Sequence, residues 1–85
     1  MQIVLSTEAK EHLLFWQKTG NKAILSKIEK LTDAIIDNPY QGLGKPEALK
    51  HNLTGCWSRR INQEHRLVYK VTIDYTILLS LKGHY

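Results

Sequence analysis

Three residues in the second half of the chain carry the side chains that metal-free RNA cleavage requires. Glu47 follows a loop rich in Gly and Pro, Arg66 lies in a β-rich run, and His84 is next to last of 85 residues. RNA can be cut through its own 2′-OH when a protein supplies a base for that hydroxyl, a cation for the charge that develops on the phosphoryl oxygens, and an acid for the departing 5′-oxygen. The residue types predict Glu47 as the base, Arg66 as the charge stabiliser and His84, whose imidazole titrates near neutral pH, as the acid.

Each of these residues also has an ordinary interpretation. Glu47 can be a solvated loop carboxylate, whose proton affinity the neighbouring lysines lower. Arg66 can pair across strands with an acid such as Glu64. His84 can be an ordinary chain-end residue. Spacing alone therefore leaves both interpretations open.

The charge distribution favours an anionic partner. Residues 1–44 hold five Lys and five acids, whereas residues 45–85 hold seven cations and three acids, so the whole net charge of +4 lies in the second half. Every Arg also lies there, and Arg suits bidentate contact with phosphate better than Lys does. Nucleic acid is the simplest such partner.

The composition is that of one compact folded domain. The chain is 42% hydrophobic and 24% charged, and a chain of this size buries a modest core, so residues 1–85 are treated as a single domain. No run approaches the roughly 18 apolar residues of a membrane span, and the first residues lack the pattern of a secretory signal. We therefore expect a soluble protein of the cytoplasm.

The cysteine and histidine pattern predicts no metal site. Cys56 is the one cysteine of the sequence, and we expect it to be a small buried apolar residue. His12, His51 and His65 lack metal-ligand spacing and are expected to be surface or sheet residues. Cleavage through the 2′-OH needs no metal or cofactor, so none is expected.

The first half of the sequence predicts a strand followed by a helical hairpin. A β-rich run covers Gln2–Leu5, and apolar residues at helical spacing predict a first helix over 8–18. A second helix is predicted between Asn21, a capping residue, and Asn38, which precedes a proline. Its buried stripe is expected to consist of Ile24, Ile28, Leu31 and Ile35.

The second half changes to a period of two, which predicts an antiparallel meander with strands over 49–53, 56–61, 65–71 and 75–81. Alternation assigns one face of the sheet to the helices, and the residues expected there are Leu67, Tyr69, Val71, Ile77, Leu79 and Leu81. The opposite, basic face is expected to carry Arg66, Lys70 and Lys82, and His84 if the extended run continues. The fold class is therefore α+β, with two N-terminal helices packed on a twisted, mainly antiparallel sheet.

Four motifs give the sequence a family resemblance. They are GKPEALKHNLTG at 44–55, WSRRI at 57–61, EHRLVY at 64–69 and the terminal HY at 84–85. Together they strongly resemble the YoeB (Txe/YoeB) toxins of bacterial toxin–antitoxin systems, which belong to the RelE superfamily. The resemblance covers nearly the whole chain and implies a compact RelE-like, microbial-RNase-like fold.

The resemblance also implies an activity, that of a ribosome-dependent mRNA interferase that cuts message in the A site. The family's catalytic positions fall on Glu47, Arg66 and His84, the residues already singled out for their chemistry. Further family positions that hold RNA or support the site fall on Lys50, Arg59, Arg60 and Tyr85. The implied products are a 2′,3′-cyclic phosphate and a 5′-OH. The implied partners are mRNA on the 70S ribosome and a YefM-type antitoxin, with a homodimer as a further assembly.

The sequence departs from the family pattern just before its end. Lys82-Gly83 stands where better-known members place an Arg and an aromatic residue. Lys82 keeps the charge for RNA contact but loses the bidentate fork, and Gly83 adds backbone freedom directly before His84. Two alternative functions remain: a toxin that stalls translation by binding the ribosome without cleavage, and a gyrase inhibitor like the ParE toxins, which needs no Glu, Arg and His set.

Overall fold

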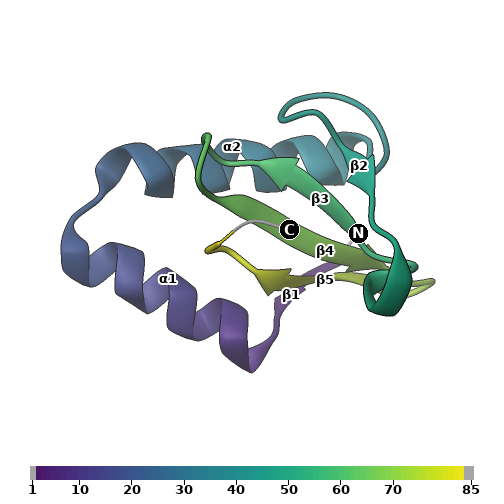
Figure 1. The fold of residues 1–85 in the computed structure, drawn as a ribbon, viewed down its shortest axis with the longest axis horizontal. Helices are drawn as coiled ribbons and strands as arrows, with labels where there is room; N and C mark the ends of the chain where they lie inside the picture. The colour runs from purple at the N-terminus through teal and green to yellow at the C-terminus, as the bar shows by residue number, and fades with distance from the viewer. Residues whose placement is uncertain (1, 84–85) are drawn as a thin grey trace.

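The computed structural model describes residues 2–83, which form two helices and a five-stranded sheet (Figure 1). The elements in chain order are β1 (Gln2–Leu5), α1 (Thr7–Thr19), α2 (Lys22–Asp37), β2 (Glu47–Ala48), the 3₁₀ helix η1 (His51–Leu53), β3 (Trp57–Arg60), β4 (Arg66–Val71) and β5 (Tyr75–Ser80). The strand order is β1-β5-β4-β3-β2. β1 runs parallel to β5, and the other neighbours are antiparallel. The α+β class and the mainly antiparallel sheet are confirmed.

Local signals place the helix ends. Ser6 accepts a hydrogen bond from the Ala9 amide at the start of α1, and Asn21 accepts one from the Ile24 amide at the start of α2. Such caps satisfy backbone donors that have no partner inside the helix. Gly20 ends α1 with a φ of 67°, a left-handed conformation that glycine adopts without a steric penalty. Both helices and β1 were predicted to within about one residue at each end.

One hydrophobic core joins the helical hairpin to the sheet. The predicted stripe of α2 is buried, as are Ala9 and Trp16 of α1. The strand side of the same cluster contains Ile61, Leu67, Tyr69, Leu78 and Leu81, and Trp57 packs against it. Cys56 is buried as predicted. The helices therefore cover one face of the sheet and leave the other face for the site.

The predicted strand over 49–53 is wrong. The strand in this region is Glu47–Ala48, and residues His51–Leu53 form the 3₁₀ helix instead. His51 has a φ of 60°, which no strand accommodates, and both the amide and the hydroxyl of Thr54 donate to the His51 carbonyl. A tight turn thus replaces the extended run that the apolar alternation predicted.

The predicted facing of β5 is also wrong in part. Tyr69 pairs with Leu78, whereas Val68 pairs with Ser80, so the register shifts by one residue between them. This β-bulge turns Leu78 toward the helices in place of Ile77 and Leu79, while Leu81 faces the core as expected. An extra residue in a strand reverses the face of the sheet to which the side chains beyond it point. The alternation of the sequence alone does not reveal where such a residue lies.

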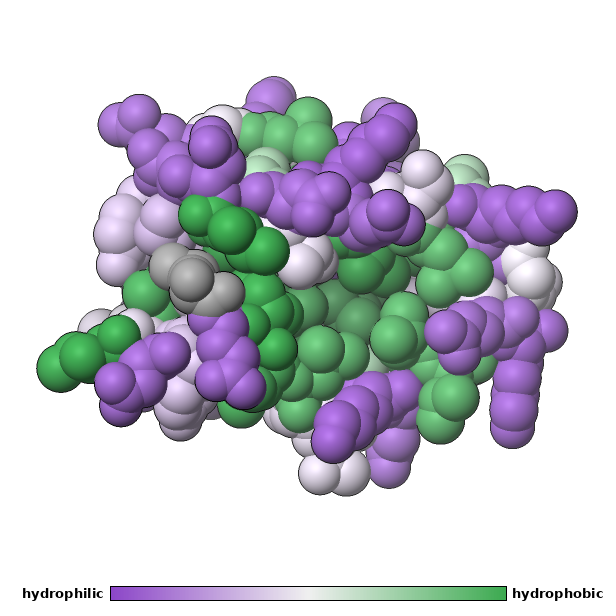
Figure 2. Space-filling model, turned by 180° about the vertical axis from the view of Figure 1, so that it is seen from behind, coloured by the Kyte–Doolittle hydropathy of each residue, from purple (hydrophilic) through white to green (hydrophobic). Residues whose placement is uncertain are grey.

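Apolar side chains also reach the surface. Figure 2 shows the molecule from behind, with hydrophobic side chains gathered across the middle of the surface and hydrophilic ones along its upper edge. The large hydrophobic residues that the structure leaves exposed are Leu14, Phe15, Ile36, Tyr40, Leu43, Ile73 and Tyr75. Among the described residues, no helix combines the length and the apolar character that crossing a membrane requires.

Candidate active site

The strand register brings Glu47 and Arg66 to the same face of the sheet, opposite the helices. Glu47 lies directly across from Ser58, and Arg60 lies directly across from Arg66. Ser58 and Arg60 are two residues apart on β3, so their side chains point to the same side. The same register places Lys70 on this face as well. A carboxylate and two guanidinium groups, distant in the sequence, therefore share one surface.

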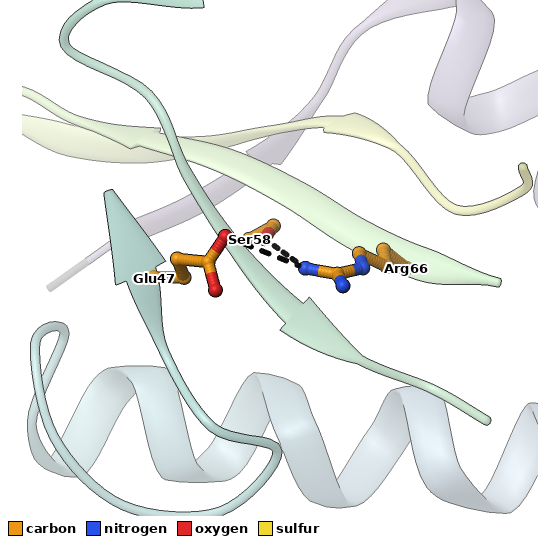
Figure 3. A network of polar contacts seen from close by, with 3 residues as sticks. All are labelled: Glu47, Ser58 and Arg66. Carbon is orange, nitrogen blue, oxygen red and sulfur yellow. Dashed lines mark hydrogen bonds and ion pairs between the residues drawn. The ribbon is translucent and has the colours of Figure 1, made fainter. Parts of the chain in front are cut away.

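Glu47, Ser58 and Arg66 form a small polar network (Figure 3). The Arg66 Nη1 atom lies 3.9 Å from Glu47 Oε1 and donates to Ser58 Oγ over 3.3 Å. Ser58 is fully buried, so this bond fixes one nitrogen of the Arg66 guanidinium to the body of the sheet. Figure 3 shows the three side chains pointing toward one another from three neighbouring strands.

The ion pair itself contributes little to stability. The separation of 3.9 Å exceeds a hydrogen-bond distance, and the Glu47 side chain is 62% exposed against 18% for Arg66. Exposed pairs of this kind are worth about 0 to 1 kcal/mol. The geometry is instead that of a preformed charge pair in which the carboxylate is accessible and the guanidinium is held in place.

The loop before Glu47 is fixed by close backbone contacts. The Arg60 amide donates to the Gly44 carbonyl over 2.7 Å. Gly44 has a φ of 86°, and a Cβ atom there would lie 2.7 Å from Leu31 Cδ2. Lys45 also adopts a left-handed φ of 53° directly before Pro46, a conformation that costs free energy for a residue other than glycine. Glu47 therefore directly follows a turn whose backbone conformation is constrained.

Arg59 was predicted to contact RNA or support the site at the surface, but the structure places it in the interior. Its neighbour Arg60 is exposed on the site face, but Arg59 is fully buried on the helix-facing side and is not available to RNA in this structure. Its guanidinium donates to the Tyr69 hydroxyl and to three loop carbonyls, those of Asn38, Gln41 and Leu43. Arg59 therefore holds the loop that leads to Glu47.

Tyr69 belongs to the same buried network. Its hydroxyl donates to the Pro39 carbonyl over 2.6 Å and accepts from Arg59. Burial raises the pKa of Tyr69 above its usual 10.0, and the neighbouring Arg59 partly opposes the shift. The phenol is therefore neutral at physiological pH and able to donate.

Two pockets with cationic residues are lined by residues close to Glu47 in the sequence. Glu47 and Lys50 line a pocket of about 430 Å³ together with residues of η1. Arg60, Lys45 and Lys27 line a second pocket of about 320 Å³. Lys50, Lys45 and Arg60 are all exposed. The surroundings of Glu47 and Arg66 therefore attract an anion such as a phosphodiester.

Lys82 and His84 were predicted to continue the basic face of the sheet toward the end of the chain. Lys82 does not extend the basic face: β5 ends at Ser80, and the Lys82 ammonium lies 4.0 Å from the centre of the Phe15 ring of α1. This cation–π contact directs the charge toward α1. His84 and Tyr85 lie outside the described residues. The geometry of the predicted acid relative to Glu47 and Arg66 stays a prediction.

Three residues of this region were not recognised from the sequence. Ser58 orients Arg66, and the strand alternation that groups it with Arg60 would have found it. His12 and His65, expected to be ordinary surface or sheet residues, both accept hydrogen bonds from backbone amides of the C-terminal segment. No spacing signal indicates those contacts, because they join residues 18 and 69 positions apart.

No group of three or more His, Cys, Asp or Glu side chains in residues 2–83 is arranged to hold a metal ion. The arrangement that the structure does provide is an accessible carboxylate beside an oriented guanidinium, with further cations nearby. Such a set can remove a proton and stabilise negative charge on phosphate.

The fold is that of a class of small α+β bacterial toxins. YafQ from Escherichia coli shares the fold at 19% identity, with a TM-score of 0.81 over 98% of this chain and 92% of its own. A structure described as a YoeB/ParE toxin from Agrobacterium tumefaciens matches the whole of both chains with a TM-score of 0.95 and 37% identity. The architecture is thus RelE- and YafQ-like.

The family follows from the sequence comparison. The model of the YoeB-like toxin of bacterial type II toxin–antitoxin systems matches residues 5–85, and toxin YoeB of Escherichia coli K12 is 47% identical over the full length of both chains. The chain belongs to the YoeB-like toxin family.

Two solved relatives from Staphylococcus aureus show assemblies of that family. A YoeB dimer matches this chain with a TM-score of 0.91 at 44% identity, and a YoeB–YefM complex matches with a TM-score of 0.89 at 45% identity. Each match covers 100% of this chain and 98% of the other.

Proposed function

We propose that this toxin is a metal-independent endoribonuclease that cuts mRNA in the ribosomal A site and so inhibits translation. The observation that carries the proposal is the pairing of Glu47 with Arg66, residues 19 positions apart, at 3.9 Å on one face of the sheet. Membership of the YoeB-like family supports it. So does the location of the whole net positive charge in residues 45–85.

The chemistry balances without a metal or cofactor. Glu47 takes the proton of the 2′-OH as the 2′-oxygen attacks the adjacent phosphorus, forming one P–O bond. Arg66 stabilises the negative charge on the non-bridging oxygens. The bond from phosphorus to the 5′-oxygen breaks, and His84 donates a proton to that oxygen. The products are a 2′,3′-cyclic phosphate and a 5′-OH.

The neighbouring residues have supporting roles in this proposal. Arg60 and Lys50, both exposed, contact the phosphates that flank the scissile bond, and Tyr85 supports the RNA at the end of the chain. Arg59 acts indirectly, through the loop that carries Glu47. Ser58 holds Arg66.

Two assemblies are part of the proposal. A YefM-type antitoxin binds the toxin in the cytoplasm, and the basic second half gives an acidic antitoxin segment a complementary surface. The toxin forms a homodimer like the Staphylococcus relative, and the apolar surface in Figure 2 offers area for a protein partner. Light scattering on size-exclusion fractions of the toxin, alone and with the antitoxin from its own operon, tests both.

The cleavage proposal is tested on ribosomes programmed with a defined message. Glu47→Gln and Arg66→Gln are each expected to lower the cleavage rate by about 10²-fold or more, because each removes one of the groups used in the transition state. Lys30→Gln removes one positive charge from the exposed side of α2 and is the charge-matched control for Arg66→Gln, and Glu29→Gln, at the neighbouring exposed residue, is the one for Glu47→Gln. Circular dichroism establishes that each variant keeps the fold. Wild-type rates in both site variants would refute the proposal.

The alternative of a toxin that binds without cutting predicts different data. Inhibition of translation would then persist in Glu47→Gln, no message fragments would appear, and binding to RNA would depend on salt by about 0.7 log units per phosphate contact. Damage to DNA on expression, without message cleavage, would instead favour gyrase as the target.

A further inference from the structure

Hydrogen bonds fix the backbone of the C-terminal segment at two residues, Leu81 and Gly83, shortly before His84 in the sequence. At Leu81, the amide donates to His12 Nδ1 over 3.0 Å and the carbonyl accepts from Trp16 Nε1 over 2.9 Å. At Gly83, the amide donates to His65 Nδ1 over 2.9 Å, and the carbonyl accepts from the Arg66 amide over 2.8 Å. Both polar backbone groups of each residue are therefore satisfied by the rest of the protein.

The groups that hold the segment are themselves fixed. Trp16 is 5% exposed, and its indole packs edge-on against the His65 ring with 4.8 Å between centroids. The hydroxyl of Ser80 donates to the Lys82 carbonyl and lies 3.4 Å from His12 Nδ1. The anchor, defined as His12, Trp16 and His65, thus joins α1 and the residue before β4 to one short stretch of chain.

The anchor connects directly to the proposed site. The Gly83 carbonyl is bonded to the amide of Arg66, the proposed charge stabiliser, and Gly83 precedes His84, the proposed acid. Gly83 has a φ of 87°, and glycine left free would sample many backbone conformations. The His65 bond removes that freedom at the last residue before the acid.

We propose that His65, assisted by His12, is a positioning residue that fixes the backbone of Gly83 beside Arg66, directly before the proposed acid in the sequence. The inference rests on the proposed function, because it assigns a role to the acid of that reaction. Each imidazole accepts through Nδ1, so each ring carries its proton on Nε2. The contribution of His65 is therefore a single acceptor atom in a fixed place, and it takes no part in the chemistry itself.

The chemistry of the anchor defines a matched pair of variants. The Oδ1 atom of Asn lies close to the position of Nδ1 in His and also accepts a hydrogen bond. His65→Asn therefore keeps the acceptor for the Gly83 amide, whereas His65→Leu keeps bulk and removes the acceptor. His12→Asn and His12→Leu form a second pair for the Leu81 amide, should His65→Leu not fold.

The experiment compares two messages on programmed ribosomes, one with a normal scissile phosphodiester and one with sulfur in place of the bridging 5′-oxygen. A thiolate leaves without protonation, so cleavage of the sulfur message does not need the acid. His65→Leu is expected to lose about 10²-fold in kcat on the oxygen message with little change in KM, and to cut the sulfur message at nearly the wild-type rate. His65→Asn is expected to retain most of the wild-type kcat on both.

Amide hydrogen exchange of Gly83 in the free toxin gives a second readout that does not depend on cleavage. Exchange is expected to accelerate in His65→Leu and to stay slow in His65→Asn. Equal losses on the two messages, or identical behaviour of the Leu and Asn variants, would overturn the positioning role while leaving the nuclease intact. Failure of the wild-type toxin to cut either message would overturn the proposed function, and the positioning role with it.

Discussion

Replacing Gly44 by Ala tests whether the turn before Glu47 is as constrained as the structure shows. Two costs add at this position. A φ of 86° is unfavourable for any residue with a Cβ atom, by about 1 to 2 kcal/mol. The new Cβ would also lie 2.7 Å from Leu31 Cδ2, 3.1 Å from Arg59 Cβ and 3.2 Å from the Arg60 carbonyl oxygen. Because Leu31 is completely buried, relieving that overlap costs about 1 to 3 kcal/mol more.

Gly55→Ala is the matched control for Gly44→Ala. Gly55 has a similar φ of 94°, but a Cβ there meets no heavy atom within 4 Å. The free energy of unfolding should therefore fall by about 1 to 2 kcal/mol in the control, from the backbone conformation alone. In Gly44→Ala it should fall by about 2 to 5 kcal/mol. The difference in free energy of unfolding between the two variants measures the steric overlap with the core, because the backbone cost that they share cancels.

Urea denaturation followed by tryptophan fluorescence gives both free energies of unfolding, provided that the m-values of the two variants agree. Gly44→Ala should also reduce message cleavage, because the Gly44 carbonyl accepts from Arg60 and the turn carries Glu47. Equal destabilisation of the two variants would refute the claim that Gly44 is required by close packing.

Three further predictions concern the network behind the site and the helix ends. Arg59→Met should lower the free energy of unfolding by about 3 kcal/mol or more, because it removes the charged hydrogen bonds by which the buried guanidinium holds three loop carbonyls and the Tyr69 hydroxyl; a change below about 1 kcal/mol in denaturant titration would show that the loop does not depend on Arg59. Tyr69 has a raised pKa in the folded state, so its contribution to stability is complete below the unfolded value near 10 and is lost as the pH rises through the higher folded value. Tyr69→Phe should lack that alkaline loss in unfolding curves measured across this range, and an identical alkaline decline in both proteins would assign the loss to other groups. Asn21→Ala should cost about 1 kcal/mol through the lost cap of α2, and an unchanged midpoint of thermal unfolding would contradict that role.

The sequence predicted those parts of the fold that depend on local physics. The stripe of α2, the cap at Asn21 and the stop before Pro39 are all readable within a few residues. The strand expected over 49–53 failed because the left-handed turn at His51 depends on how the loop is closed by Thr54. The wrong facing of Leu79 has a similar cause, because one bulge reverses a pattern of period two.

The proximity of two of the candidate site residues was predictable from the sequence, and the placement of the others only partly. Residue types identified Glu47 and Arg66, and the structure brings them together. The sequence did not distinguish the adjacent basic residues Arg59 and Arg60. Alternation along the strand points them to opposite faces, so that Arg59 is buried and holds the loop whereas Arg60 is an exposed cation. The contact of His65 with the Gly83 amide could not be predicted, because nothing local connects the two residues.

The most direct test of the central claim is the chemical identity of the new 3′ ends when ribosome-bound message is incubated with the toxin. Attack by the 2′-oxygen, with Glu47 as base and Arg66 as charge stabiliser, predicts fragments that end in a 2′,3′-cyclic phosphate, detected by mass spectrometry, and their disappearance in Glu47→Gln. Fragments that end in a 3′-hydroxyl, or cyclic ends that persist unchanged in Glu47→Gln, would contradict it.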